Sequence, residues 1–269
     1  MIIKTLAFIG YRLTKTSNEI QNIHRQNMNG LFQRFLTSLE NEKTKESERN
    51  ANFDFASFVL AHKELTSSQL FQDLAYLYFC GAPENKHYFV EVGVGNGIDH
   101  SNNLMLEKRY SMKGLLIEPD PRQKVSIKKN RTAQYIGMAA SASLKYVEFT
   151  LTSIPELSWT GLKPEDALER NVLSVEKVQA KSLNDILTEH IPKDCALDFL
   201  SVDVEGSELD VLDGFNLSVW KPRFVCVEHN YQIAMQEALI VYFSAYYDLV
   251  LKDISGCDFW FVRKDLVIL

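Results

Sequence analysis

The segment HYFVEVGVGNGID, residues 87–99, places one acid and three glycines where an apolar run gives way to a loop. Glu91 lies inside the apolar run, and Gly93, Gly95 and Gly97 follow it at every second position. Glycine permits backbone angles and close approaches that a Cβ forbids, so this spacing indicates that another group comes very near the backbone. Bare backbone and amide donors beside a carboxylate are suited to hold a small ligand.

A second acid, Glu118, lies at the end of the next apolar run, GLLIEPD. A carboxylate about 20 residues beyond such a glycine loop can accept hydrogen bonds from both hydroxyls of a ribose. The order strand, glycine loop, helix, strand, acid is much more specific than the glycines alone, and a tight turn without a ligand is the less favoured alternative. The order predicts an adenosine-containing ligand.

The glycine spacing separates two kinds of adenosine ligand. Dinucleotide sites favour G-x-G-x-x-G, with the pyrophosphate at a helix N-terminus, whereas this loop reads G-x-G-x-G. Glu91 would be unhelpful beside a pyrophosphate but suits an ammonium group. We therefore predict S-adenosylmethionine, which has an ammonium group, a ribose and no phosphate. Asn102, at the start of the following helix, is a further candidate contact.

Acids and one histidine gather at the ends of two later apolar runs. Asp203 and Glu205 end LDFLSVDVEG, while Glu228 and His229 end RFVCVEH. Buried carboxylates are costly unless they are paired or ligated, so this concentration indicates a site rather than packing. We expect Asp203, Glu205 and His229 to be catalytic, with His229 as a general base oriented by Asp203. In the less favoured alternative, Asp203, Glu228 and His229 bind Mg²⁺ or Mn²⁺.

Short apolar runs alternate with helical segments from residue 87 onward. This pattern predicts an α/β fold with a mostly parallel seven-stranded sheet, with strands at 88–94, 114–120, 133–140, 197–206, 223–229, 247–254 and 258–264. The last two runs are joined only by SGC, which is too short for a crossover helix, so we expect a terminal antiparallel hairpin. Residues 145–152 and 176–183 predict an additional hairpin. Helices are expected at 1–40, 67–79, 100–110, 121–131, 182–190 and 206–215.

Bulk properties exclude several classes of protein. The 269 residues, 46% of them hydrophobic, fit one large α/β domain with an extension. A formal net charge of -6 argues against a general nucleic-acid binder. No stretch approaches the ~20 apolar residues of a membrane span, and four scattered cysteines indicate a reducing compartment. We therefore expect a cytoplasmic protein with no transmembrane segment and no nucleic-acid partner.

The sequence resembles the FkbM family of S-adenosylmethionine-dependent methyltransferases. The resemblance spans roughly residues 66–264, in the family's order, through SQLFQDL (68–74), FVEVGVGNGIDHSNNLMLEK (89–108), GLLIEPDP (114–121), LDFLSVDVEGSELDVLDGF (197–215) and FVCVEHN (224–230). It implies a class I Rossmann-like methyltransferase domain at residues 61–269, preceded by a helical N-terminal extension at 1–60. It also implies an O-methyltransferase acting on a hydroxyl of a sugar, a glycan or a secondary metabolite.

One departure from the family falls in AASASLKYVEF, where Ala142 stands at a position that often carries an Asp after a Ser. An acid there often meets the adenine amino group in such folds, so Ser141 is the remaining candidate. The complete set of predicted cofactor contacts is Glu91, Gly93, Gly95, Gly97, Asn102, Glu118, Ser141 and Asp203.

Two further functions stay open beside methyl transfer. A catalytically inactive, methyltransferase-like module would act through partner contacts of residues 1–50, although the acids at three strand ends weigh against inactivity. A nicotinamide-dependent oxidoreductase is disfavoured by the glycine spacing and by the terminal hairpin. The expected partner is a small-molecule or glycan acceptor. Two roles stay open for the N-terminal helices, namely to mediate a homo-oligomer or to close over the active site.

Overall fold

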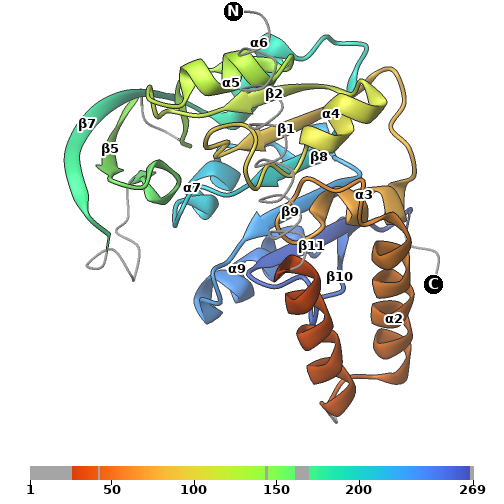
Figure 1. The fold of residues 1–269 in the computed structure, drawn as a ribbon. Coiled ribbons are helices and arrows are strands. Elements are labelled where there is room, and N and C mark those ends of the chain that lie inside the picture. The colour runs from red at the N-terminus through yellow and green to blue at the C-terminus, as the bar shows by residue number, and fades with distance from the viewer. Residues whose placement is uncertain (1–25, 42, 143–144, 161–169, 267–269) are drawn as a thin grey trace, which may run out of the picture.

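A seven-stranded sheet forms the centre of the computed structural model, which describes residues 26–41, 43–142, 145–160 and 170–266 (Figure 1). The order is β10-β11-β9-β8-β1-β2-β3, formed by β1 (His87–Val92), β2 (Lys113–Ile117), β3 (Gln134–Ile136), β8 (Ala196–Val202), β9 (Phe224–Glu228), β10 (Tyr247–Val250) and β11 (Asp258–Arg263). Only β11 runs antiparallel to its neighbours, β9 and β10. The predicted mostly parallel sheet with a terminal antiparallel hairpin is confirmed.

Helices cover both faces of this sheet because alternate residues of a strand point to opposite sides. Val90 and Val92 of β1 pack in one core, with α6 (Leu183–His190), α7 (Glu208–Asp213), α8 (Leu217–Trp220) and α9 (Ile233–Phe243). Phe89 packs in the other core, with α3 (Gln72–Cys80), α4 (Leu104–Tyr110) and α5 (Lys124–Asn130). Glu91 shares the face of Phe89, which places a carboxylate among apolar side chains.

A smaller four-stranded sheet lies beside the carboxyl ends of the main strands. Its order is β4-β7-β5-β6, from β4 (Ala139–Ala140), β5 (Tyr146–Thr152), β6 (Trp159–Thr160) and β7 (Val172–Lys181), with the short 3-10 helix η1 (Pro155–Leu157) before β6. The antiparallel pairing of β5 with β7 confirms the predicted additional hairpin. The strand predicted at 133–140 is instead divided, since β3 joins the main sheet and β4 the small one.

The N-terminal helices pack against the same core as the main sheet. The helix of residues 26–40 and α2 (Glu46–His62) run side by side (Figure 1), while residues 1–25 of the predicted helical stretch lie outside the described residues. Leu31, Phe55 and Val59 are fully buried, and the Phe55 ring lies 5.5 Å from that of Trp260 in β11. None of the described helices is both long enough and apolar enough to cross a membrane.

Candidate active site

A cleft of about 1100 Å³ opens at the carboxyl ends of β1, β2, β8 and β9. Ligands of open parallel sheets bind at this edge, where strand ends and helix starts meet. The strand ends contribute Glu91, Glu118, Asp203 and Glu228 to its lining. The sequence-predicted acids of four separate segments therefore face one cavity.

The glycine loop owes much of its composition to contacts within the protein. A Cβ on Gly93, whose φ is +82°, would lie 1.6 Å from the backbone oxygen of Asp203. A Cβ on Gly97 would lie 3.2 Å from Ile127 Cγ1 and 3.3 Å from Arg131 Cγ. Gly95 also has a positive φ, of 54°, and lines the cleft. The protein's own packing thus excludes a side chain at Gly93 and disfavours one at Gly97. We expected these glycines to make room for a ligand, and that reason alone does not explain them.

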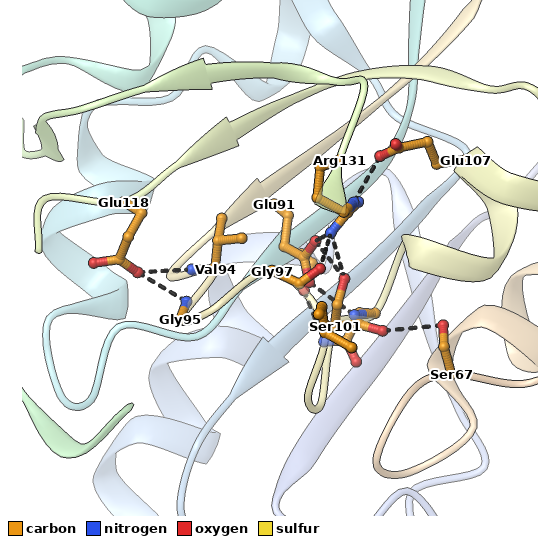
Figure 2. Close-up of polar contacts among 12 residues, drawn as sticks. Ser67, Glu91, Val94, Gly95, Gly97, Ser101, Glu107, Glu118 and Arg131 are labelled. Carbon is orange, nitrogen blue, oxygen red and sulfur yellow. Dashed lines mark hydrogen bonds and ion pairs between the residues drawn. The ribbon is translucent and has the colours of Figure 1, made fainter. Parts of the chain in front are cut away.

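Glu118 is held by the loop that it faces (Figure 2). Its Oε2 accepts hydrogen bonds from Val94 N at 3.0 Å and Gly95 N at 2.9 Å, and its Oε1 accepts one from Asp120 N at 2.8 Å. Burial raises the pKa of Glu118 to about 7, although these three amides oppose the increase. A carboxylate oxygen has more than one acceptor direction, so the group can still bind hydroxyls in the cleft.

Glu91 lies at the centre of a buried ionic network (Figure 2). Its Oε1 accepts from Asn102 N at 2.7 Å, and its Oε2 accepts from Ser101 Oγ at 2.9 Å and lies 3.4 Å from Arg131 Nη1. Arg131 also donates from Nε to Glu107 Oε2 at 2.7 Å. Burial raises the pKa of Glu91, and Arg131 is the largest opposing influence.

This network gives Glu91 a structural role beside the one that we predicted. Its carboxylate faces a guanidinium as well as the cleft, and its contact with an ammonium group stays a prediction. Arg131 Nη1 additionally donates to Gly97 O at 3.2 Å and to Ser101 Oγ at 2.8 Å. The network therefore fixes the shape of the glycine loop, although Glu91 itself still borders the cleft.

Three carboxylates gather at the ends of β8 and β9. Asp203, Glu205 and Glu228 each place an oxygen within 4.8 Å of the others, and the side chains of Asp203 and Glu228 are hydrogen-bonded. Burial, and then the negative charge of Glu205, raises the pKa of Asp203, while burial and Asp203 raise that of Glu228. The mutual repulsion means that Asp203 and Glu228 retain a proton to higher pH than isolated carboxyls do.

His229 borders a small second pocket, together with Glu205 and Glu228, rather than the main cleft that we expected it to face. It is 3% exposed, does not line the main cleft, and packs with its ring centroid 4.3 Å from that of Phe259. Its Nδ1 accepts from Tyr231 N at 2.9 Å, and burial lowers its pKa. Among the described residues, the group close enough to share a metal ion is Asp203, Glu205 and Glu228, so Glu205 takes the place that we predicted for His229 in such a set. The catalytic role of His229 stays a prediction.

The other predicted contacts differ in their access to the cleft. Asn102 lines it and donates from Nδ2 to Ser201 Oγ at 2.9 Å, while its Oδ1 makes no hydrogen bond with the described residues. Ser141 is 1% exposed and does not line the cleft, although the preceding Ala139 and Ala140 do. The small side chains before Ser141, rather than its hydroxyl, therefore form this part of the wall.

Sequence reasoning missed several residues of the cleft. Arg170, two residues before β7, forms an ion pair with Glu205 at 2.7 Å and donates a hydrogen bond to Leu157 O at 2.9 Å. Asn230 and Tyr231 line the cleft with positive φ values of 47° and 60°. Asparagine adopts such a backbone more often than most residues, but a tyrosine gives no signal of it in the sequence. Strained residues of this kind concentrate at functional sites.

The strand order and the acid-lined cleft beside a glycine loop define a class I Rossmann-like methyltransferase fold. The sequence matches the methyltransferase FkbM domain over residues 80–257, and the chain belongs to this family.

The matches among solved structures are distant. The crystal structure of the methyltransferase FkbM from Methylobacillus flagellatus KT matches with 16% identity and a TM-score of 0.45, over 86% of this chain and 58% of that one. A fibrillarin/Nop5p complex matches with 8% identity and a TM-score of 0.40, over 71% of this chain and 79% of that one. No curated protein matches the sequence.

Proposed function

We propose that the protein is an S-adenosylmethionine-dependent O-methyltransferase that acts on a hydroxyl of a sugar, a glycan or a secondary metabolite. One observation carries the choice of cofactor: the amides of Val94 and Gly95 donate to Glu118. In a dinucleotide site, such loop amides bind the pyrophosphate. Here an internal carboxylate occupies them, which favours an adenosine ligand without phosphate.

The charge of the cleft supports the same choice. Among the described residues that line it, six are carboxylates and one is an arginine: Glu91, Asp99, Glu118, Asp203, Glu205, Glu228 and Arg170. Arg170 is paired with Glu205. A negative cavity attracts a sulfonium and an ammonium group and repels phosphate. An uncharged acceptor, such as a polyol, fits it better than a phosphorylated or carboxylated one.

Asp203 is the proposed general base. When bound, S-adenosylmethionine supplies a methyl group on positively charged sulfur, and an acceptor hydroxyl is a poor nucleophile until a base takes its proton. Asp203 borders the cleft, and the side-chain hydrogen bond with Glu228 favours its ionised form. The nearby charge of Glu205 increases its affinity for a proton. This carboxyl pair replaces the buried His229 in the role that we predicted.

Calorimetric titration with S-adenosylhomocysteine, the thioether product, tests the proposal. We expect micromolar binding, none of comparable strength for NAD⁺ or NADH, and at least about thirtyfold weaker binding by Glu118→Ala, which loses charge-assisted hydrogen bonds. Glu176→Ala, an exposed acid on β7, is the matched control and should bind like the wild type. A well-folded wild-type protein that binds no S-adenosylhomocysteine would contradict the proposal and favour the inactive-module alternative.

The affinity for S-adenosylhomocysteine is expected to fall as the pH falls below 7. Burial raises the pKa of Glu118 to about 7, and only the ionised group presents both oxygens as acceptors to the ribose. If only that form binds, affinity at pH 6 is about tenfold lower than at pH 8. Titrations across this range should show a flat profile for Glu118→Gln. An equal pH dependence in that variant would assign the effect to another group.

A further inference from the structure

One end of the cleft is walled by three segments that are distant in sequence. In the main sheet, β1 and β8 separate β9 from β2, so the wall that follows β9 lies opposite the Glu118 end. Leu70, Asn230, Tyr231 and Cys257 line the cleft at this far end. With Glu118 assigned to the nucleoside, this wall is the one that the methyl acceptor meets.

The turn of residues 251–257 holds the segments of this wall together. The backbone oxygen of Cys257 accepts hydrogen bonds from His229 N at 2.8 Å and from Asn230 N at 3.2 Å. A Cβ on Gly256 would lie 3.1 Å from Leu70 Cδ1, so Leu70 packs directly on the turn. A shift of this turn would therefore move Leu70 and the backbone that carries Tyr231.

Arg34, from the helix of residues 26–40, contacts the same turn but does not itself line the cleft. Its Nε donates to Ile254 O at 2.8 Å, and its guanidinium carbon lies 3.6 Å from a Cβ position on Gly256. Its Nη2 is buried and makes no hydrogen bond with the described part of the chain. Arg34 lies outside residues 80–257, the part that matches the family domain. The contact thus connects the N-terminal extension to the turn that holds this wall of the cleft together.

Charge adds a second connection between Arg34 and this end of the cleft. Asp258 directly follows the turn, is buried with 5% of its surface exposed, and accepts a hydrogen bond from Gln72 Nε2 at 2.7 Å. The positive charge of Arg34 favours the ionised form of Asp258, and Asp258 in turn acts electrostatically on Asp203 and Glu228. A neutral side chain of similar size at position 34 would supply packing without this influence.

We propose that Arg34 is a positioning residue for the acceptor end of the cleft, and that the N-terminal helices therefore take part in acceptor recognition. This inference rests on the proposed methyl transfer. Arg34 touches neither the Glu118 carboxylate nor the glycine loop in the contacts described. Its loss is expected to loosen the wall at Tyr231 and Cys257 and to leave the nucleoside end unchanged.

Hydrogen exchange measured by mass spectrometry tests the positioning role directly. In Arg34→Ala, amide exchange in peptides covering 228–232 and 251–258 is expected to rise about tenfold, because local opening becomes easier. Peptide-level labelling of Cys257 by a thiol reagent should accelerate in parallel, while Arg34→Lys, which keeps a donor and a charge, should recover part of the protection. Calorimetry with S-adenosylhomocysteine should give a Kd within about threefold of the wild type.

Arg49→Ala is the matched control, because Arg49 lies in α2 of the same extension and donates from Nη2 to Asn41 O at 3.0 Å. Unchanged exchange and Cys257 labelling in both Arg34 variants, or an equal change in Arg49→Ala, would overturn the proposal. If Arg34→Ala fails to fold, Arg34→Lys decides by the same measurements. Absence of S-adenosylhomocysteine binding by the wild type would instead contradict the proposed function and leave the exchange result to decide the role of Arg34.

Discussion

Replacing Gly93 with alanine is expected to destabilise the protein by roughly 4 kcal/mol and to lower its Tm by about 10 °C. The added Cβ would lie 1.6 Å from the backbone oxygen of Asp203. That oxygen cannot rotate away as a side chain could, because Asp203 N is bonded to Val92 O at 2.9 Å. The strand ends that carry Asp203 and the glycine loop must separate, so binding of S-adenosylhomocysteine should be lost as well.

Gly81→Ala provides a matched control for the backbone cost of this substitution. Gly81 has a φ of +73°, close to that of Gly93, but a Cβ there meets nothing within 4 Å. Its replacement should cost only about 1–3 kcal/mol, because a side chain is strained at φ +73° and ψ -168°, a conformation that glycine adopts readily. Thermal unfolding of both variants separates the steric clash from the angle. Similar losses in the two variants would show that the approach of Asp203 is unimportant.

Local pattern was sufficient to predict the sheet but not the orientation of its end residues. The apolar runs located the seven strands and the terminal hairpin, since β-strands and crossovers leave clear marks in a single sequence. The place of His229 outside the main cleft has a simple geometric cause: successive residues at a strand end point to opposite sides. Once Glu228 faces the cleft, its neighbour His229 points away and packs against Phe259.

The buried network around Glu91 depends on pairings that no local pattern encodes. Glu91 was recognisable as an acid within an apolar strand, and such an acid requires a partner. Arg131 lies 40 residues further along the chain, in one of several basic positions near α5, and only the packing of α5 on β1 brings it to 3.4 Å. Arg34 and Arg170 were missed for the same reason, because their partners Ile254 and Glu205 are distant in sequence.

The carboxyl cluster of Asp203, Glu205 and Glu228 affects the stability of the protein as well as the chemistry of the cleft. Because burial and like charges raise the pKa of Asp203 and Glu228 above ordinary values, their contribution to stability is full below the unfolded-state pKa and is lost as the pH rises through the folded-state pKa. Shifted pKa values of this kind are common at functional sites and suit the proton-accepting role proposed for Asp203.

Asp203→Asn should therefore lower methyl transfer by about 10²–10⁴-fold, the usual contribution of a general base. The isosteric amide cannot accept the acceptor proton, but it preserves the shape of the cleft. S-adenosylhomocysteine affinity should change by less than about tenfold, and the protein should gain about 1 kcal/mol at pH 8, because one of the crowded charges is removed. The rate is followed as S-adenosylhomocysteine release with any acceptor that the wild type methylates, and unfolding is followed in parallel.

Two comparison variants control for the Asp-to-Asn change itself and for the alternative base, His229. Asp185→Asn makes the same change at an exposed position in the first turn of α6, and should leave the rate unaltered and lower the stability by less than about 1 kcal/mol. His229→Gln removes the residue that the sequence favoured as the base, and its loss should be smaller than that of Asp203→Asn, since the ring lies outside the cleft. The reverse ranking would return the base to His229. A slow but more stable Asp203→Asn protein would instead assign proton transfer to the carboxyl pair, since a purely structural carboxyl would not slow the reaction when it is removed.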